Sequence, residues 1–317
     1  TDLPLYYTVF TGRDPDSILF EPNTAEGDDD GNLFKFNASY AFSSDVMGYV
    51  TVSEGFRIGG VNAVAACPPN VDDITNQLIC ALPDEAMYDA DTTTNYEAGI
   101  KTSWFKSRFT FNVAAFNVDW EDPQVSGITE NGAVGILTNA KGANAKGVEI
   151  SSRATLSDDL TMYAAYSYAK TEMTDDAFGI FGSTGDTVYK GDRLPGSPEH
   201  QISIGLNYTT ELWNRLLDLS YGFTAQSDVY STLGLRNYGE ELPGYGLSNI
   251  SAKLSDEAWS VTFYVNNLFD KYAFTSASRN WGDIEYGNRG SDLQRSYAHY
   301  ILTPRTVGLK FSYQFGM

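Results

Sequence analysis

Hydrophobic and polar residues alternate with a period of two over much of this chain, as they do in a β-strand that has one apolar face. In residues 201–209, large apolar residues take the even positions, whereas polar residues or glycine take the odd positions. The same alternation returns at 217–224, 259–266 and 306–315. The pattern therefore predicts an all-β protein whose strands each have a polar and an apolar face.

Charged residues indicate what the two faces contact. Within the clearest predicted strands, the charged residues that fall on the polar face are Lys35, Glu97, Lys101, Glu149, Arg153, Asp218, Lys253 and Lys310. A charge on the lipid side of a membrane barrel costs about 2–4 kcal/mol near the midplane, so this segregation is expected of a barrel with a wet interior. A soluble sandwich would also separate its faces, so alternation alone leaves both architectures open.

The strands can be bounded from the same pattern. We predict them at 5–10, 33–43, 46–54, 95–105, 108–129, 133–156, 159–171, 199–211, 215–228, 246–255, 258–268 and 305–315. The apolar phase changes within 108–129, which indicates a bulge near Ala114 and Ala115.

Connection lengths favour the barrel over the sandwich. The short connections are 44–45, 106–107, 157–158, 212–214 and 256–257. The long ones cover about 55–94, 172–198, 229–245 and 269–304, and the link 130–132 is the one short member of that set. Short turns at one rim and longer loops at the other are typical of outer-membrane barrels. About twelve strands fit either a closed barrel or the second half of a twenty-two-stranded one.

Composition narrows the function further. The chain has 41 acidic and 21 basic residues and a formal net charge of -20, which disfavours nucleic acid as a partner. No apolar run is long enough for a transmembrane helix. Residues 1–4 do not resemble a signal peptide, so we expect the native start to lie upstream.

The residues with reactive side chains are few. Cys67 and Cys80 lie in one polar stretch, and in an oxidising compartment we expect them to form a disulfide. The histidines, His200 and His299, are distant from the cysteines in sequence. We therefore expect no metal site and no cofactor. No nucleophile elbow is present, and we expect no catalytic residues.

The last predicted strand carries a recognisable motif. Thr306, Gly308, Phe311, Tyr313 and Phe315 resemble the terminal signal of outer-membrane proteins, in which a polar residue and a glycine precede spaced aromatic residues. The resemblance implies that barrel-assembly machinery reads this strand. Two residues follow Phe315, whereas such chains usually end on the aromatic residue.

Four further segments are similar to the C-terminal half of TonB-dependent outer-membrane receptors. They are YVTVSEGFRIGG at 49–60, NYEAGIK at 95–101, NAKG with KGVE between 139 and 149, and NNLFDKY at 266–272. They occur in the family's order, and the resemblance spans about residues 33–315. Because that family forms a twenty-two-stranded barrel around a plug, we expect residues 1–317 to be the C-terminal part of the β-barrel domain. The N-terminal plug and the first barrel half would then lie outside this sequence.

The resemblance implies uptake of a scarce nutrient across the bacterial outer membrane, most often an iron–siderophore complex, with cobalamin or an oligosaccharide as other substrates. Implied partners are outer-membrane lipid and lipopolysaccharide, the TonB complex acting through the plug, the barrel-assembly machinery and a small-molecule nutrient. Two alternatives stay open. One is a passive porin-like or small twelve-stranded barrel, and the other is an outer-membrane enzyme barrel.

Ligand contacts are expected in the long connections, because arginine and aromatic residues dominate binding hot spots. The candidates are Arg57, Tyr88, Arg279, Trp281, Tyr286 and Arg289. Ordinary loop packing or solvent exposure is the competing interpretation of each.

Overall fold

The computed structural model describes most of the chain. The described residues are 27, 30–67, 77, 80–132, 134–183, 185–236, 238–279, 285–286, 293–294 and 297–315. The predicted strand at 5–10 lies outside them, as do Trp281 and Arg289. No helix in the described part of the chain is long and apolar enough to cross a membrane.

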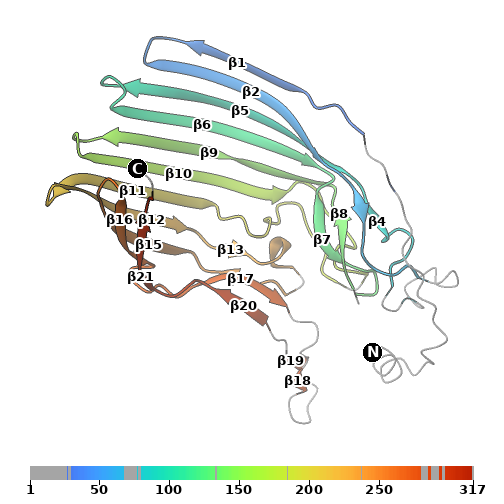
Figure 1. Ribbon diagram of the computed structural model, residues 1–317. Coiled ribbons are helices and arrows are strands. Elements are labelled where there is room, and N and C mark those ends of the chain that lie inside the picture. The colour runs from blue at the N-terminus through green and yellow to red at the C-terminus, as the bar shows by residue number, and fades with distance from the viewer. Residues whose placement is uncertain are drawn as a thin grey trace.

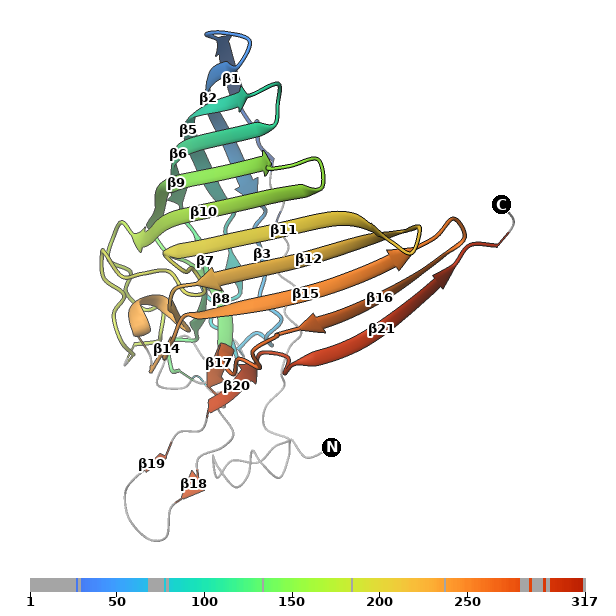
Figure 2. The same cartoon turned by 90° about the vertical axis from the view of Figure 1, so that its left-hand side faces the viewer.

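One antiparallel sheet of eleven strands dominates the fold (Figure 1). Its strands, in spatial order, are β1 (Lys35–Ala41), β2 (Val46–Arg57), β5 (Asp91–Trp104), β6 (Phe109–Glu121), β9 (Gly142–Thr155), β10 (Leu160–Met173), β11 (His200–Leu212), β12 (Arg215–Gln226), β15 (Tyr245–Ser255), β16 (Trp259–Asn266) and β21 (Thr306–Tyr313). The spatial order follows the chain order, as in a barrel wall. The sheet is strongly curved, and its edge strands β1 and β21 lie far apart in both views (Figures 1 and 2).

The long connections form small two-stranded sheets of their own. The pairs are β3 (Gly60–Val61) with β4 (Met87–Tyr88), β7 (Gln124–Ile128) with β8 (Gly135–Asn139), β13 (Val229–Tyr230) with β14 (Glu241–Leu242), β17 (Phe274–Arg279) with β20 (Tyr297–Ile301), and β18 (Glu285–Tyr286) with β19 (Leu293–Gln294). A short 3-10 turn, Leu233–Leu235, follows β13. All these pieces gather at the rim opposite the short turns (Figure 1). The predicted asymmetry of the two rims is confirmed.

The strand register confirms the two faces. Asp218 has Thr209 and Lys253 as its cross-strand partners, whereas Leu219, the next residue, has Tyr208 and Ala252. The eight charged residues of the predicted polar face all share one side of the sheet, which is called the interior face below. The opposite, apolar side is called the outer face.

The predicted bulge in strand 108–129 is wrong. β6 pairs with both neighbours without a register shift, and Ala114 and Ala115 lie opposite Gly99 and Ala98. The apolar positions of β6 switch faces because the strand, which stays regular, passes from the sheet into the packed rim. Near the long-connection rim, the interior face of β6 carries Trp120, which other rim residues cover, and the outer face becomes polar.

The two longest predicted strands each break in two. Residues 108–129 become β6 and β7, separated at Asp122 and Pro123, and residues 133–156 become β8 and β9. Proline cannot donate a hydrogen bond to a strand ladder, so it ends pairing there. The link at 130–132 is therefore the turn of a separate hairpin at the rim.

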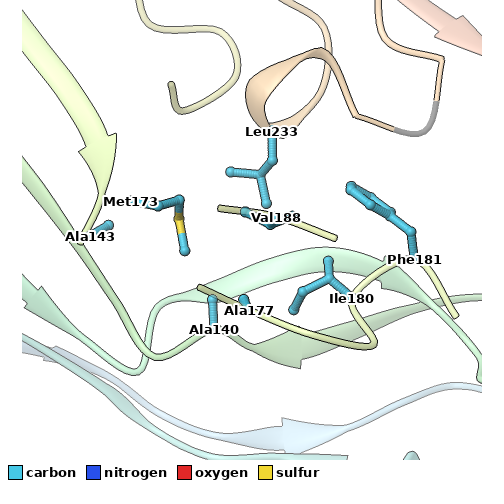
Figure 3. Close-up of a cluster of buried hydrophobic side chains, with 8 residues drawn as sticks. All are labelled: Ala140, Ala143, Met173, Ala177, Ile180, Phe181, Val188 and Leu233. Carbon is cyan, nitrogen blue, oxygen red and sulfur yellow. The ribbon is translucent and has the colours of Figure 1, made fainter. Parts of the chain in front are cut away.

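The buried apolar core lies in the long connections, because a single-layered sheet encloses none. Its main cluster consists of Ala140, Ala143, Met173, Ala177, Ile180, Phe181, Val188 and Leu233 (Figure 3). These residues come from the end of the β7–β8 hairpin, from β9 and β10, from the β10–β11 connection and from the turn after β13. The rim is thus a packed cap rather than a set of independent loops.

Candidate functional site

A cavity of about 520 Å³ lies within this cap. Its wall includes four aromatic side chains, Trp120, Phe181, Tyr238 and Tyr297, which come from four separate segments. Serine, threonine and glutamine supply its polar groups, and no Asp, Glu, Lys or Arg is among the described lining residues. A mostly apolar concave site with a few polar groups is the usual form of a small-molecule site.

Packing and hydrogen bonds hold the cavity wall in place. Phe181 belongs to the buried core of the cap. Tyr297 in β20 donates its hydroxyl to the backbone oxygen of Tyr238 at 3.1 Å. His299, two residues on, contacts a carboxylate oxygen of Glu240 through Nε2 at 2.5 Å. These two contacts join the β17–β20 hairpin to the β13–β14 connection across the cavity.

Arg57, a predicted ligand contact, is not among the described lining residues of the cavity. Its guanidinium forms an ion pair with Asp91, and its Nη2 donates to the backbone oxygen of Gln124 at 3.2 Å. The guanidinium also lies 5.5 Å from the centroid of the Trp120 ring. Asp91 accepts a further hydrogen bond of 2.9 Å from the backbone N–H of Gln124. Arg57 therefore joins Asp91, Gln124 and the Trp120 ring in one cluster beside the cavity.

Trp120 and Gln124 are the members of this group that line the cavity. The indole Nε1 of Trp120 is buried, and no described residue accepts a hydrogen bond from it. A buried donor without a partner is uncommon in proteins. Sequence reasoning missed Trp120, although the phase change that we interpreted as a bulge was the signal that marked it.

The remaining predicted ligand contacts are not part of the described cavity lining. Tyr88 in β4 packs against Gly60 and is absent from the described lining. Arg279 ends β17, directly after Ser278, which lines the cavity. Tyr286 is in β18, and the structure describes no side-chain position for it or for Arg279. Trp281 and Arg289 lie outside the described residues.

Basic side chains near the cavity are engaged in the cap itself. Arg193 pairs with Asp228 at 2.6 Å, and Arg236 pairs with Asp192 at 2.9 Å. Hydrogen bonding to the Asp192 carboxylate raises the pKa of Arg236. Both guanidinium groups also stack on tyrosine rings, at 4.9 and 5.1 Å from the centroids. Their charge stabilises loop packing and leaves the described cavity wall neutral.

The predicted disulfide between Cys67 and Cys80 is present. Glu85, close to it in sequence, is buried and accepts hydrogen bonds from the backbone of Leu82 at 2.8 Å and from the Gln77 amide at 2.6 Å. It also accepts a hydrogen bond of 2.5 Å from the backbone N–H of Glu130 in the β7–β8 turn. The disulfide loop thus anchors the hairpin that lines the cavity. Among the described residues, no group of three His, Cys, Asp or Glu could hold a metal ion.

Comparisons with known proteins place this geometry in a family. The profile of the TonB dependent receptor-like β-barrel matches residues 6–268. The ferric-pyoverdine M114 receptor of a Pseudomonas strain is 28% identical over 203 residues, which are 61% of this chain and 23% of that protein. A metal-pseudopaline receptor of Pseudomonas aeruginosa is 27% identical over 202 residues, which are 61% of this chain and 26% of that protein. The chain thus matches about a quarter of each relative.

The fold agrees with the family. The ferric yersiniabactin uptake receptor of Yersinia pestis superposes with a TM-score of 0.67 at 21% identity, over 89% of this chain and 37% of that one. The profile covers most of the sequence, and the superposition covers most of the chain. The chain therefore belongs to the TonB-dependent receptor family of bacterial outer-membrane β-barrels.

Proposed function

We propose that the receptor to which this chain contributes takes up a metal–siderophore complex, and that the rim cavity binds part of that complex. The matched relatives are transport receptors rather than enzymes, and their names specify ferric-pyoverdine and metal-pseudopaline. The observation that carries the proposal is the cavity with four aromatic side chains, together with the buried Trp120 Nε1, which has no hydrogen-bond partner among the described residues. It lies on the rim of long connections, which faces outward from the cell in outer-membrane barrels.

The proposed path continues along the interior face. There the sheet borders a second hollow of about 730 Å³, lined in part by Lys101, Asn112, Glu149 and Gln226. We infer that the plug, with its TonB contact, and the remaining strands come from the rest of the receptor. The outer face would contact lipid and lipopolysaccharide, and the motif in β21 would serve the assembly machinery.

A matched pair of tryptophan substitutions tests the cavity in the full receptor. Trp120→Phe removes the buried N–H, and Trp259→Phe removes an indole from β16, whose 259 end lies at the short-turn rim. We expect the Trp120 variant to bind its best ferric chelate about tenfold more weakly, equivalent to about 1.4 kcal/mol. The Trp259 variant should bind normally.

The assay is radiolabelled-iron binding and uptake with ferric chelates of the hydroxamate, catecholate and mixed phenolate types. Failure of every metal chelate to bind the unaltered receptor would overturn the proposed function. Normal binding and uptake by the Trp120 variant would show that the cavity takes no part in binding the complex.

A further inference from the structure

An apolar groove of about 600 Å³ runs across the outer face of β1, β2, β5 and β6. Its floor is a row of small side chains that are cross-strand partners, namely Ala38, Val50, Ala98 and Ala115. The adjacent row toward the short turns contains larger residues, including Tyr40, Ile100 and Val113. We call this feature the outer groove.

Glycine opens the outer groove at its end near the short-turn rim. Gly48 lies between Tyr40 of β1 and Ile100 of β5 in the larger row. A Cβ at this position would lie 2.8 Å from Cε2 of Phe42, so a side chain there would meet that ring. Phe42 in turn makes an edge-to-face contact with Tyr40 at 5.1 Å between ring centroids. An aromatic pair therefore marks the end of the groove, as expected where a barrel meets the membrane surface.

The outer groove is open in the described part of the chain. Tyr40 is 68% exposed, and Val50 and Ile100 are 47% and 49% exposed. β1, β2, β5 and β6 form one end of the sheet, away from the hairpin β17–β20 (Figure 1). In an outer-membrane barrel this face contacts lipid, so the groove is continuous with the lipid-covered surface.

Charge at the short-turn rim complements a lipid headgroup. The turn between β5 and β6, which both line the groove, contains Lys106 and Arg108 and no acidic residue. Arg108 pairs with Asp158 of the next turn at 3.4 Å, whereas no ion pair joins Lys106 to another described residue. A basic side chain at this level suits the phosphate of a phospholipid, because lysine can extend its ammonium group to the headgroup layer.

We propose that the outer groove binds an acyl chain of one phospholipid from the periplasmic leaflet, with its phosphate beside Lys106. The site is independent of the proposed uptake function. Its physical basis is a depression in the outer face into which methylene groups fit, together with a cation at the depth of the headgroup.

Native mass spectrometry of the full receptor tests the site, with dipalmitoyl phosphatidylglycerol as the added lipid in mild detergent. Ala98→Leu with Ala115→Leu fills the groove, and Ala252→Leu is the matched control, because Ala252 is a small outer-face residue on β15. We expect lipid retention in the groove variant to fall about tenfold, equivalent to about 1.4 kcal/mol. Retention in the Ala252 variant should be unchanged.

Lys106→Gln tests the contribution of the headgroup to lipid retention separately from that of the acyl chain. It should weaken retention of phosphatidylglycerol and leave retention of an uncharged diacylglycerol unaltered. Folding of every variant is checked by heat-modifiable mobility, which apolar substitutions on a lipid face should preserve. Equal lipid loss from the groove variant and its control would overturn the proposal, as would a receptor dimer that the groove variant alone disrupts.

Discussion

The orientation of the strand faces can be tested with two adjacent residues of β12. Leu219 is on the outer face with Tyr208 and Ala252 as partners, and Ser220 is on the interior face, where its hydroxyl donates to Oδ1 of Asn207 at 2.9 Å. Leu219→Arg would place a guanidinium against lipid, whereas Ser220→Arg would place it in water. Both variants introduce arginine at positions that differ by one, so the main difference between them is the face that receives the charge.

The expected magnitude follows from the depth of Leu219. It lies four residues beyond Arg215, at the short-turn end of β12. At about 3.4 Å per residue and a tilt of about 40°, that separation is roughly 10 Å along the membrane normal. The apolar band of such barrels is about 25 Å tall, so Leu219 is near its middle, where arginine costs about 2–4 kcal/mol. We expect Ser220→Arg to cost under about 1 kcal/mol, because its side chain stays hydrated.

The assay is equilibrium unfolding of the full receptor in phospholipid vesicles, followed by tryptophan fluorescence and by heat-modifiable mobility on gels. The free energy of unfolding should fall for Leu219→Arg and change little for Ser220→Arg. A larger loss for Ser220→Arg would show that the faces are reversed, and the lipid-facing assignment would then be abandoned.

Two further predictions concern the cap and the last strand. Cys67→Ala should remove about 3 kcal/mol of chain-entropy stabilisation from its loop and free the hydrogen-bond network at Glu85. Amide exchange should therefore quicken at 80–86 and 124–131 and stay slow in the sheet strands, and unaltered exchange at 80–86 and 124–131 would contradict the anchoring role. Gly308→Ala should displace the Tyr264 ring, which lies over Gly308, and cost about 1 kcal/mol, lowering the folded yield on gels. Gly222→Ala is its control, because a Cβ at Gly222 meets no atom within 4 Å, and equal yields from both variants would refute the packing argument.

The sequence by itself determined the barrel wall. A strand in a sheet exposes alternate residues to opposite sides, so a wall with lipid on one side and water on the other must show a period of two. That local rule predicted all eleven described strands of the sheet and the face of the eight charged residues in the clearest strands. It also predicted the arrangement of short and long connections. The disulfide could also be predicted from the sequence, because two cysteines allow only one intramolecular pairing.

Only the tertiary structure decided what happens at the rim of long connections. There β6 keeps its register but enters the cap, so Trp120 is covered by contacts with Arg57 and with residues distant in sequence. Alternation then no longer distinguishes lipid from water, and the pattern led us to a bulge that is absent. The cavity joins residues from 120 to 297 in sequence, and no local pattern encodes such contacts. The position of the cavity follows from the packing of several connections against one another. That packing depends on contacts among all of them and cannot be read from any single segment.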